Sequence, residues 1–193
     1  MKAITLLRVD SSRAASRSAN RHVAIGDLDE LAAGLARVFQ VSCHVEAEPV
    51  DAEFSYDVAR DQYNSTAILQ RLADRGSEAE RHLLGISGLD LFVPILTFVF
   101  GEAQFAGHCA VVSVHRLREE FFGLTPRAGI QRERLLKVAV HELGHTLGLR
   151  HCADWHCVMA TTHNVEGLDL KGMEFCVRCL SRSGLAAAMR GRV

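Results

Sequence analysis

The order of apolar segments along the 193-residue chain predicts an α/β fold with a twisted, mixed sheet of five strands and helices packed against it. Residues 4–9 (ITLLRV) and 109–115 (CAVVSVH) are near-continuous apolar runs, which is the pattern of buried strands, and we expect the second to lie centrally. Segments with helical spacing of apolar residues alternate with them. The resulting order is strand, helix, strand, helix, strand, strand, strand.

Three helices are expected. The first begins at Asp27, because Asp27 and Glu30 form a capping-box pattern ahead of an apolar stripe. The second spans residues 62–75 and is stopped by a glycine. The third spans residues 131–149, where leucine and valine recur at helical spacing and face the core.

The remaining strands are short. Residues 41–47 form the second strand of the sheet and residues 83–87 the third. Residues 91–101 form the fourth, and Pro94 places it at an edge because proline cannot donate to a ladder on both sides. An edge strand leaves backbone groups free, so residues 97–105 are expected to be an edge strand along the cleft to which an extended peptide can pair.

Composition limits the classes of partner. Charged residues make up 23% of the chain and the net charge is −1, so no basic surface for nucleic acid is predicted. The longest apolar stretch falls short of a membrane span and is interrupted by charge and proline. The first ten residues lack the pattern of a secretory signal, which predicts a reducing, cytoplasmic setting. The length suits a single domain, residues 1–193.

The third helix carries a metal-binding pattern. His141 and His145 are four residues apart, so both imidazoles leave the same helix face and can bind one Zn²⁺. Glu142 lies one step around the helix, where a carboxylate can take a proton from a zinc-activated water. Gly148 ends the helix and turns the chain, and His151 supplies a third nitrogen. By chance this spacing would occur in such a chain on the order of one time in ten thousand.

Four of the six cysteines follow this motif in two pairs. Cys152 and Cys157 are followed by Cys176 and Cys179, and both spacings suit a tetrahedral structural zinc. The alternative is a pair of disulfides or free thiols, which a reducing setting disfavours. Met159 lies between the pairs and, on its chemistry alone, could be an ordinary core residue.

These motifs resemble a known family. The run HELGHTLGLRHCADWHCVM at residues 141–159, followed by CVRC at residues 176–179, is similar to the archaemetzincins, a branch of the metzincin metallopeptidases. The resemblance implies a metzincin-like (zincin) fold, with residues 1–148 as an upper subdomain that includes the active-site helix and residues 149–193 as a small zinc-stapled C-terminal subdomain. It also implies a catalytic zinc on His141, His145 and His151, Glu142 as general base, a Met-turn at Met159, and a second zinc on Cys152, Cys157, Cys176 and Cys179.

The predicted activity is hydrolysis of a peptide bond by a zinc-activated water, with a peptide or protein as substrate. The peptide specificity comes from the resemblance, because the same residues could hydrolyse a non-peptide amide or an ester. A third hypothesis is a zinc-stabilised binding module with vestigial activity. The intact Glu142 argues against it, since a module without catalysis does not need the base.

Overall fold

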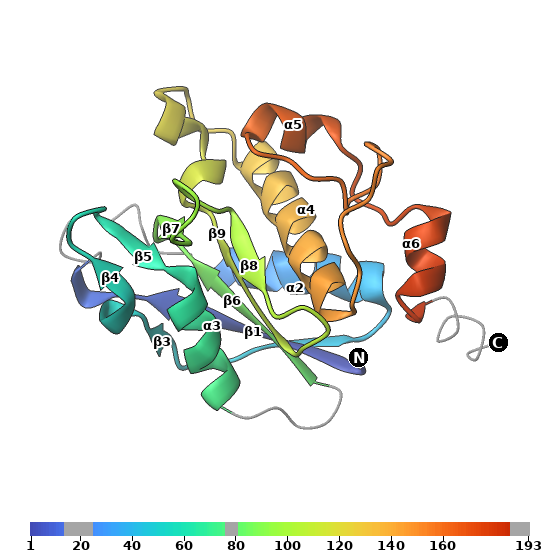
Figure 1. The fold of residues 1–193 in the computed structure, drawn as a ribbon, viewed down its shortest axis with the longest axis horizontal. Helices are drawn as coiled ribbons and strands as arrows, with labels where there is room; N and C mark the ends of the chain where they lie inside the picture. Colours follow the sequence, from blue (N-terminus) through green and yellow to red (C-terminus); the bar gives the residue numbers. More distant parts are fainter. Residues whose placement is uncertain (14–24, 76–80, 186–193) are drawn as a thin grey trace.

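A sheet crossed by one long helix forms the centre of the molecule (Figure 1). The structure is a computed structural model that describes residues 1–13, 25–75 and 81–185. The strands of the main sheet lie in the order β2-β1-β6-β9-β8, and the short β3 also pairs with β1. Their bounds are β1 Ala3–Asp10, β2 Ser42–Val45, β3 Val50–Asp51, β6 Arg81–Ser87, β8 Gly101–Ala103 and β9 Cys109–Ser113.

The sheet is mixed, as the sequence predicts. β1 runs parallel to β2, β3 and β6, and β6 runs parallel to β9. β8 alone among these strands is antiparallel to its neighbour, β9, and closes one edge. The predicted central position of the strand at residues 109–115 is one place off, because β6 holds the middle and β9 lies between β6 and β8.

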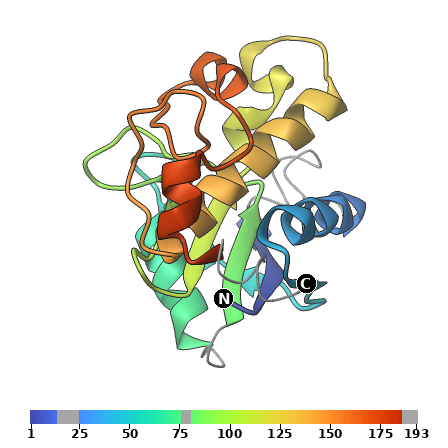
Figure 2. The same cartoon turned by 90° about the vertical axis from the view of Figure 1, so that its right-hand side faces the viewer.

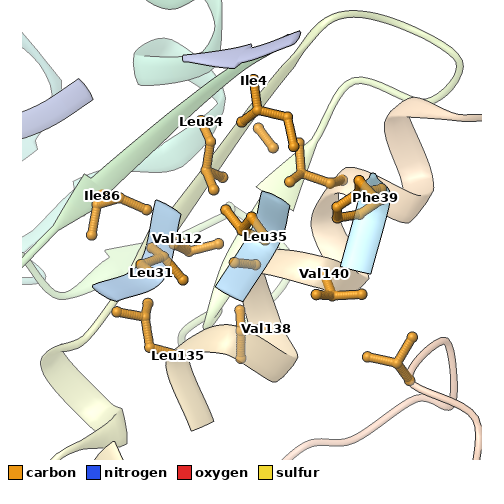
Figure 3. Close-up of a cluster of buried hydrophobic side chains, with 14 of the residues drawn as sticks. Ile4, Leu31, Leu35, Phe39, Leu84, Ile86, Val112, Leu135, Val138 and Val140 are labelled. Atoms are coloured by element: carbon orange, nitrogen blue, oxygen red, sulfur yellow. The ribbon is translucent and has the colours of Figure 1, made fainter. Parts of the chain in front are cut away.

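Alternate residues of the strands serve two separate cores. One face, which includes Leu84 and Val112, packs against helices α2 (Ile25–Phe39) and α4 (Ala128–Thr146) (Figure 3). The opposite face, which includes Leu83 and Val111, packs against α3 (Ser65–Asp74). The sheet therefore has helices on both faces, and α4 is held against it by the larger cluster.

The observed helices differ from the predicted ones at their ends. α2 begins at Ile25, two residues before the predicted capping box at Asp27. α3 begins at Ser65 rather than at residue 62, because the side chain of Asn64 accepts a hydrogen bond from the N–H of Ala67 and caps it. The preceding residues form the strand β5 (Gln62–Asn64) instead. α4 lies three residues earlier at both ends than the predicted 131–149.

The predicted strand at residues 91–101 was wrong in its middle. Only β7 (Leu91–Phe92) and β8 pair as strands, and residues 93–100 form turns and a loop. The chain folds back there, since the N–H of Val99 donates to the carbonyl of Leu91 at 2.9 Å. β7 joins β5 and β4 (Tyr56–Asp57) in a second, three-stranded sheet that the sequence did not predict. The predicted edge position is nevertheless occupied by β8.

The chain from residue 147 to residue 185 packs onto the same core as α4 (Figure 2). It contains two short helices, α5 (Val165–Leu170) and α6 (Val177–Arg182). Val158, Met159 and Leu168 are fully buried in the larger cluster. Three short 3-10 helices complete the described elements: η2 (Glu53–Ser55), η3 (His115–Leu117) and η4 (Glu119–Phe122). Within the described residues, every helix is too short or too polar to cross a membrane.

Candidate metal centre and catalytic cleft

The last turns of α4 present two imidazoles side by side. His141 Nδ1 donates to the carbonyl of Val158 at 2.8 Å, and His145 Nδ1 donates to the carbonyl of Leu149 at 2.7 Å. Each Nε2 is therefore left with a free lone pair. The two Nε2 atoms lie 3.2 Å apart.

His151 completes this group from outside the helix. Gly148 adopts a positive φ of 78° directly after α4, and the chain turns back there. The His151 ring stacks on His141 with 5.3 Å between centroids and lies edge-on to His145 at 5.0 Å. One nitrogen from each of the three rings falls within 4.8 Å of the others.

The three nitrogens fit a zinc ion. A tetrahedral zinc with Zn–N bonds of about 2.05 Å places its nitrogen ligands about 3.3 Å apart, close to the Nε2 separation in α4. Burial lowers the pKa of His141 to about 3 and also lowers the pKa of His145 and of His151. These shifts favour the neutral form of the imidazoles, which metal binding requires.

Glu142 lies beside the histidines at the wall of a cleft of about 290 Å³. Within the described residues, no hydrogen bond reaches its carboxylate, and burial raises its pKa to about 8 while the Lys171 ammonium opposes that shift. The cleft is lined by residues 96–101, Val138, His141, Glu142, His151, Thr161, Thr162, His163 and Lys171. Glu142 is therefore a carboxyl group without a hydrogen-bond partner among the described residues, and it faces a space large enough for a substrate segment.

The four predicted cysteines converge in a second group. Their sulfurs all lie within 4.8 Å of one another, and the sulfurs of Cys152 and Cys176 are 3.8 Å apart, too far for a disulfide. A tetrahedral zinc with Zn–S bonds of about 2.3 Å places sulfur ligands about 3.8 Å apart. The N–H of Cys176 donates to Cys157 Sγ, and Arg178 donates to Cys152 Sγ, contacts that favour thiolates. The donor set fits a structural zinc.

Met159, which the family resemblance suggests as a Met-turn, packs against the helix that carries His141 and His145. It is fully buried, and its sulfur faces Gly144 on α4. A methyl group at Gly144 would lie 2.5 Å from Met159 Sδ and 3.1 Å from the ring of Phe175. The absence of a side chain at Gly144 allows this close approach of the turn to the helix.

Two further residues contribute to this site, and the sequence analysis missed the second of them. Gly101 of β8 packs on the base, since a methyl group there would lie 2.8 Å from Glu142 Cγ. Lys171 is buried beside His141, with Nζ 3.5 Å from Nδ1 of that ring. Burial lowers the pKa of Lys171 to about 8, and Glu142 acts in the opposite direction. Neither residue belongs to a spaced motif, and a fold is needed to bring them here.

Comparison with known proteins gives a family match. A family model described as peptidase family M54 matches residues 42–183. An archaemetzincin from Methanocaldococcus jannaschii is 41% identical over 129 residues, which cover 67% of this chain and 70% of that relative. An archaemetzincin from Archaeoglobus fulgidus is 37% identical over 165 residues, which cover 86% and 93% respectively.

Solved structures agree with the sequence match. The crystal structure of the Archaeoglobus fulgidus archaemetzincin complexed with malonate superposes with a TM-score of 0.75 at 34% identity and covers 93% of this chain and 99% of that one. A zinc-dependent peptidase from Methanocorpusculum labreanum superposes with a TM-score of 0.78 at 26% identity, with the same coverage of both chains. The metzincin-like fold and the family resemblance predicted from the sequence are confirmed.

The contact between Gly144 and Met159 predicts an effect opposite to helix propensity. Replacing an interior helical glycine with alanine ordinarily stabilises a helix by about 0.5–1 kcal/mol. Gly144→Ala should instead lower the melting temperature, because the added methyl group displaces Met159. The control is Gly129→Ala in the same helix, where nothing lies within 4 Å of the added methyl group. A Gly144→Ala protein at least as stable as the wild type would refute the close packing.

Proposed function

Because this chain belongs to peptidase family M54, the archaemetzincins, and is a metallopeptidase, we propose that it hydrolyses peptide bonds with Zn²⁺ on His141, His145 and His151 and with Glu142 as general base. The observation that carries this proposal is the convergence of three imidazole nitrogens within 4.8 Å of one another, with Glu142 on the wall of the same cleft as His141 and His151. Family membership makes a peptide or protein the substrate class, which favours this function over a non-peptide hydrolase or a binding module.

The chemistry divides between metal and protein. Bound Zn²⁺ supplies a Lewis acid that polarises a carbonyl and acidifies a water molecule. Glu142 takes the proton from the attacking water and then passes it to the leaving amine nitrogen. Its carboxylate is suited to both steps, since it faces the cleft, is desolvated and has no hydrogen-bond donor among the described residues. Gly101 keeps the carboxylate in place by packing against its Cγ.

The substrate is proposed to bind as an extended strand along β8. The N–H of Ser113 bonds to the carbonyl of Phe100, and the N–H of Gln104 bonds to the carbonyl of Cys109. By the alternation of an antiparallel ladder, Gly101 and Ala103 point their backbone groups away from β9, toward the open edge. Those groups can pair with a peptide that lies beside Glu142.

The second zinc is proposed to bind Cys152, Cys157, Cys176 and Cys179. Because four thiolates fill a tetrahedral shell, this zinc would be structural, giving two zinc ions per chain. It would link the loop after α4 to α6 and define residues 149–193 as a C-terminal subdomain. Met159 is proposed to be the hydrophobic floor under the catalytic metal rather than a ligand.

Replacing Glu142 with glutamine should separate catalysis from metal binding. Glu142→Gln preserves size and removes basicity, so peptide hydrolysis should fall by at least about a hundredfold, the scale of a lost general base. Zinc content, measured by elemental analysis, should stay at the wild-type value. The matched control is Glu166→Gln on the exposed surface of α5, which should leave turnover unchanged. Wild-type turnover in Glu142→Gln would assign the base elsewhere.

The two metal sites are also proposed to be coupled through one peptide bond. His151 and Cys152 are adjacent, so their Cα atoms are about 3.8 Å apart. His151 lies outside the helix, whereas its neighbour Cys152 is held by the cysteine group and by an N–H bond to the carbonyl of Met159 at 2.9 Å. Cys176→Ser should therefore weaken zinc affinity at the histidines as well as at the cysteines.

A graded chelator competition measures this coupling. The control is Cys43→Ser in β2, away from both groups, which should leave both affinities unchanged. If Cys176→Ser stays folded and its histidine group binds zinc with wild-type affinity, the two sites are independent.

A further inference from the structure

A lysine ammonium is buried beside His141 and forms no ion pair within the part of the chain that the structure describes. Lys171 is only 4% exposed, and no carboxylate of the described residues lies within ion-pair distance of it. Its Nζ donates instead to two backbone carbonyls, Val158 at 2.9 Å and Ala160 at 3.3 Å. A buried ammonium is tolerated only where such partners satisfy it, so these bonds fix where the side chain lies.

The two carbonyls flank Met159. The carbonyl of Val158 also accepts the His141 Nδ1–H bond at 2.8 Å, so it is shared by an imidazole and an ammonium. The carbonyl of Met159 itself accepts from the N–H of Cys152 at 2.9 Å. Three consecutive carbonyls are thus held by donors from three different segments, and two of the three bind Lys171.

The helix that carries His141 also places Lys171. Arg134 of α4 makes a two-pronged ion pair with Asp169 of α5, with both N–O distances 2.7 Å. Lys137, one turn further along α4, donates to the carbonyls of Leu168 and Asp169 at 3.2 and 3.0 Å. These contacts fix the end of α5, and Lys171 follows it directly as the C-cap.

We propose that Lys171 is a positioning residue for the catalytic metal: by holding the carbonyls of Val158 and Ala160 it fixes the acceptor of His141 Nδ1–H, and so the direction of His141 Nε2. The proposal rests on the three-histidine zinc site proposed above. The hydrogen-bond partner of a ligating imidazole sets its tautomer and ring orientation, and loss of such a partner weakens metal binding. Here the partner of His141 is the backbone carbonyl of Val158, and Lys171 holds that carbonyl in place. Lys171 therefore helps to set the orientation of the His141 ring.

Two other roles for Lys171 give different results in experiment. A brace that only attaches α5 would change overall stability without favouring one metal site. A cation that only binds substrate in the cleft, which Lys171 also lines, would raise KM and leave metal affinity unchanged.

The test is zinc affinity at each donor group, measured by graded chelator competition in Lys171→Met, which keeps the unbranched side chain out to the ε position and removes the ammonium. The histidine group should bind zinc about 10–100-fold more weakly, as for other lost partners of a ligating histidine, and the cysteine group should be unchanged. The control is Leu69→Ala, a core variant of α3 in the other hydrophobic cluster, which lowers stability far from the turn and should leave both affinities at wild type.

The outcomes separate this inference from the proposed function. No zinc on the histidines of the wild type would refute the zinc site itself. Wild-type affinity at the histidines in Lys171→Met, or an equal loss at both groups, would overturn the role of Lys171 alone. If Lys171→Met does not fold, Lys171→Gln decides, since its shorter amide reaches one carbonyl rather than two. An affinity between those expected for wild type and Lys171→Met supports the proposal, and wild-type affinity overturns it.

Discussion

The hydrogen bond between His141 Nδ1 and the carbonyl of Val158 joins the active-site helix to the turn after the cysteine loop, and both proposed metal sites depend on it. On one side it orients an imidazole of α4. On the other it fixes Val158, the residue directly after Cys157. The next residue, Met159, accepts a hydrogen bond from the N–H of Cys152 through its carbonyl. A displacement of this turn would therefore move one histidine and two cysteines together. Lys171 binds the same carbonyl and adds a donor that is independent of either metal.

The sheet makes this arrangement possible because α4 packs against it through one side only. The core cluster holds the apolar side of the helix, including Val140 and Leu143, against the strands. The other side carries the histidines toward the turn, and Glu142 toward β8, where Gly101 leaves room for it. Because β8 is at the edge, Glu142 lies beside backbone groups that are open to pairing with an extended segment. The fold thus supplies both the desolvation of Glu142 and the open edge that the proposed function requires.

The sequence predicted those parts of the site that lie close together along the chain. The spacing of His141, Glu142 and His145 is set by one turn of helix, and the cysteine pairs have local spacing too, so their convergence follows from short-range geometry. Four of the five predicted strands lie in the main sheet as β1, β2, β6 and β9. The predicted strand at residues 91–101 was largely wrong, because an apolar run does not reveal that the chain folds back at Pro94. Lys171 could not be predicted, since its partners are carbonyls that any residue would offer.

The histidine group and the cysteine group are proposed to hold one zinc ion each, and the two ions should differ in how easily a chelator removes them. Elemental analysis of the purified protein before and after exposure to a graded chelator tests this proposal directly, with the reactivity of the cysteine thiols followed in parallel. We expect two zinc ions per chain. The first ion should leave while the cysteine thiols stay unreactive, because the histidine group keeps an open coordination position. The second ion should leave only as the thiols become reactive, because the four cysteines close its coordination shell. One zinc ion per chain, or thiols that react as the first ion leaves, would contradict the proposal.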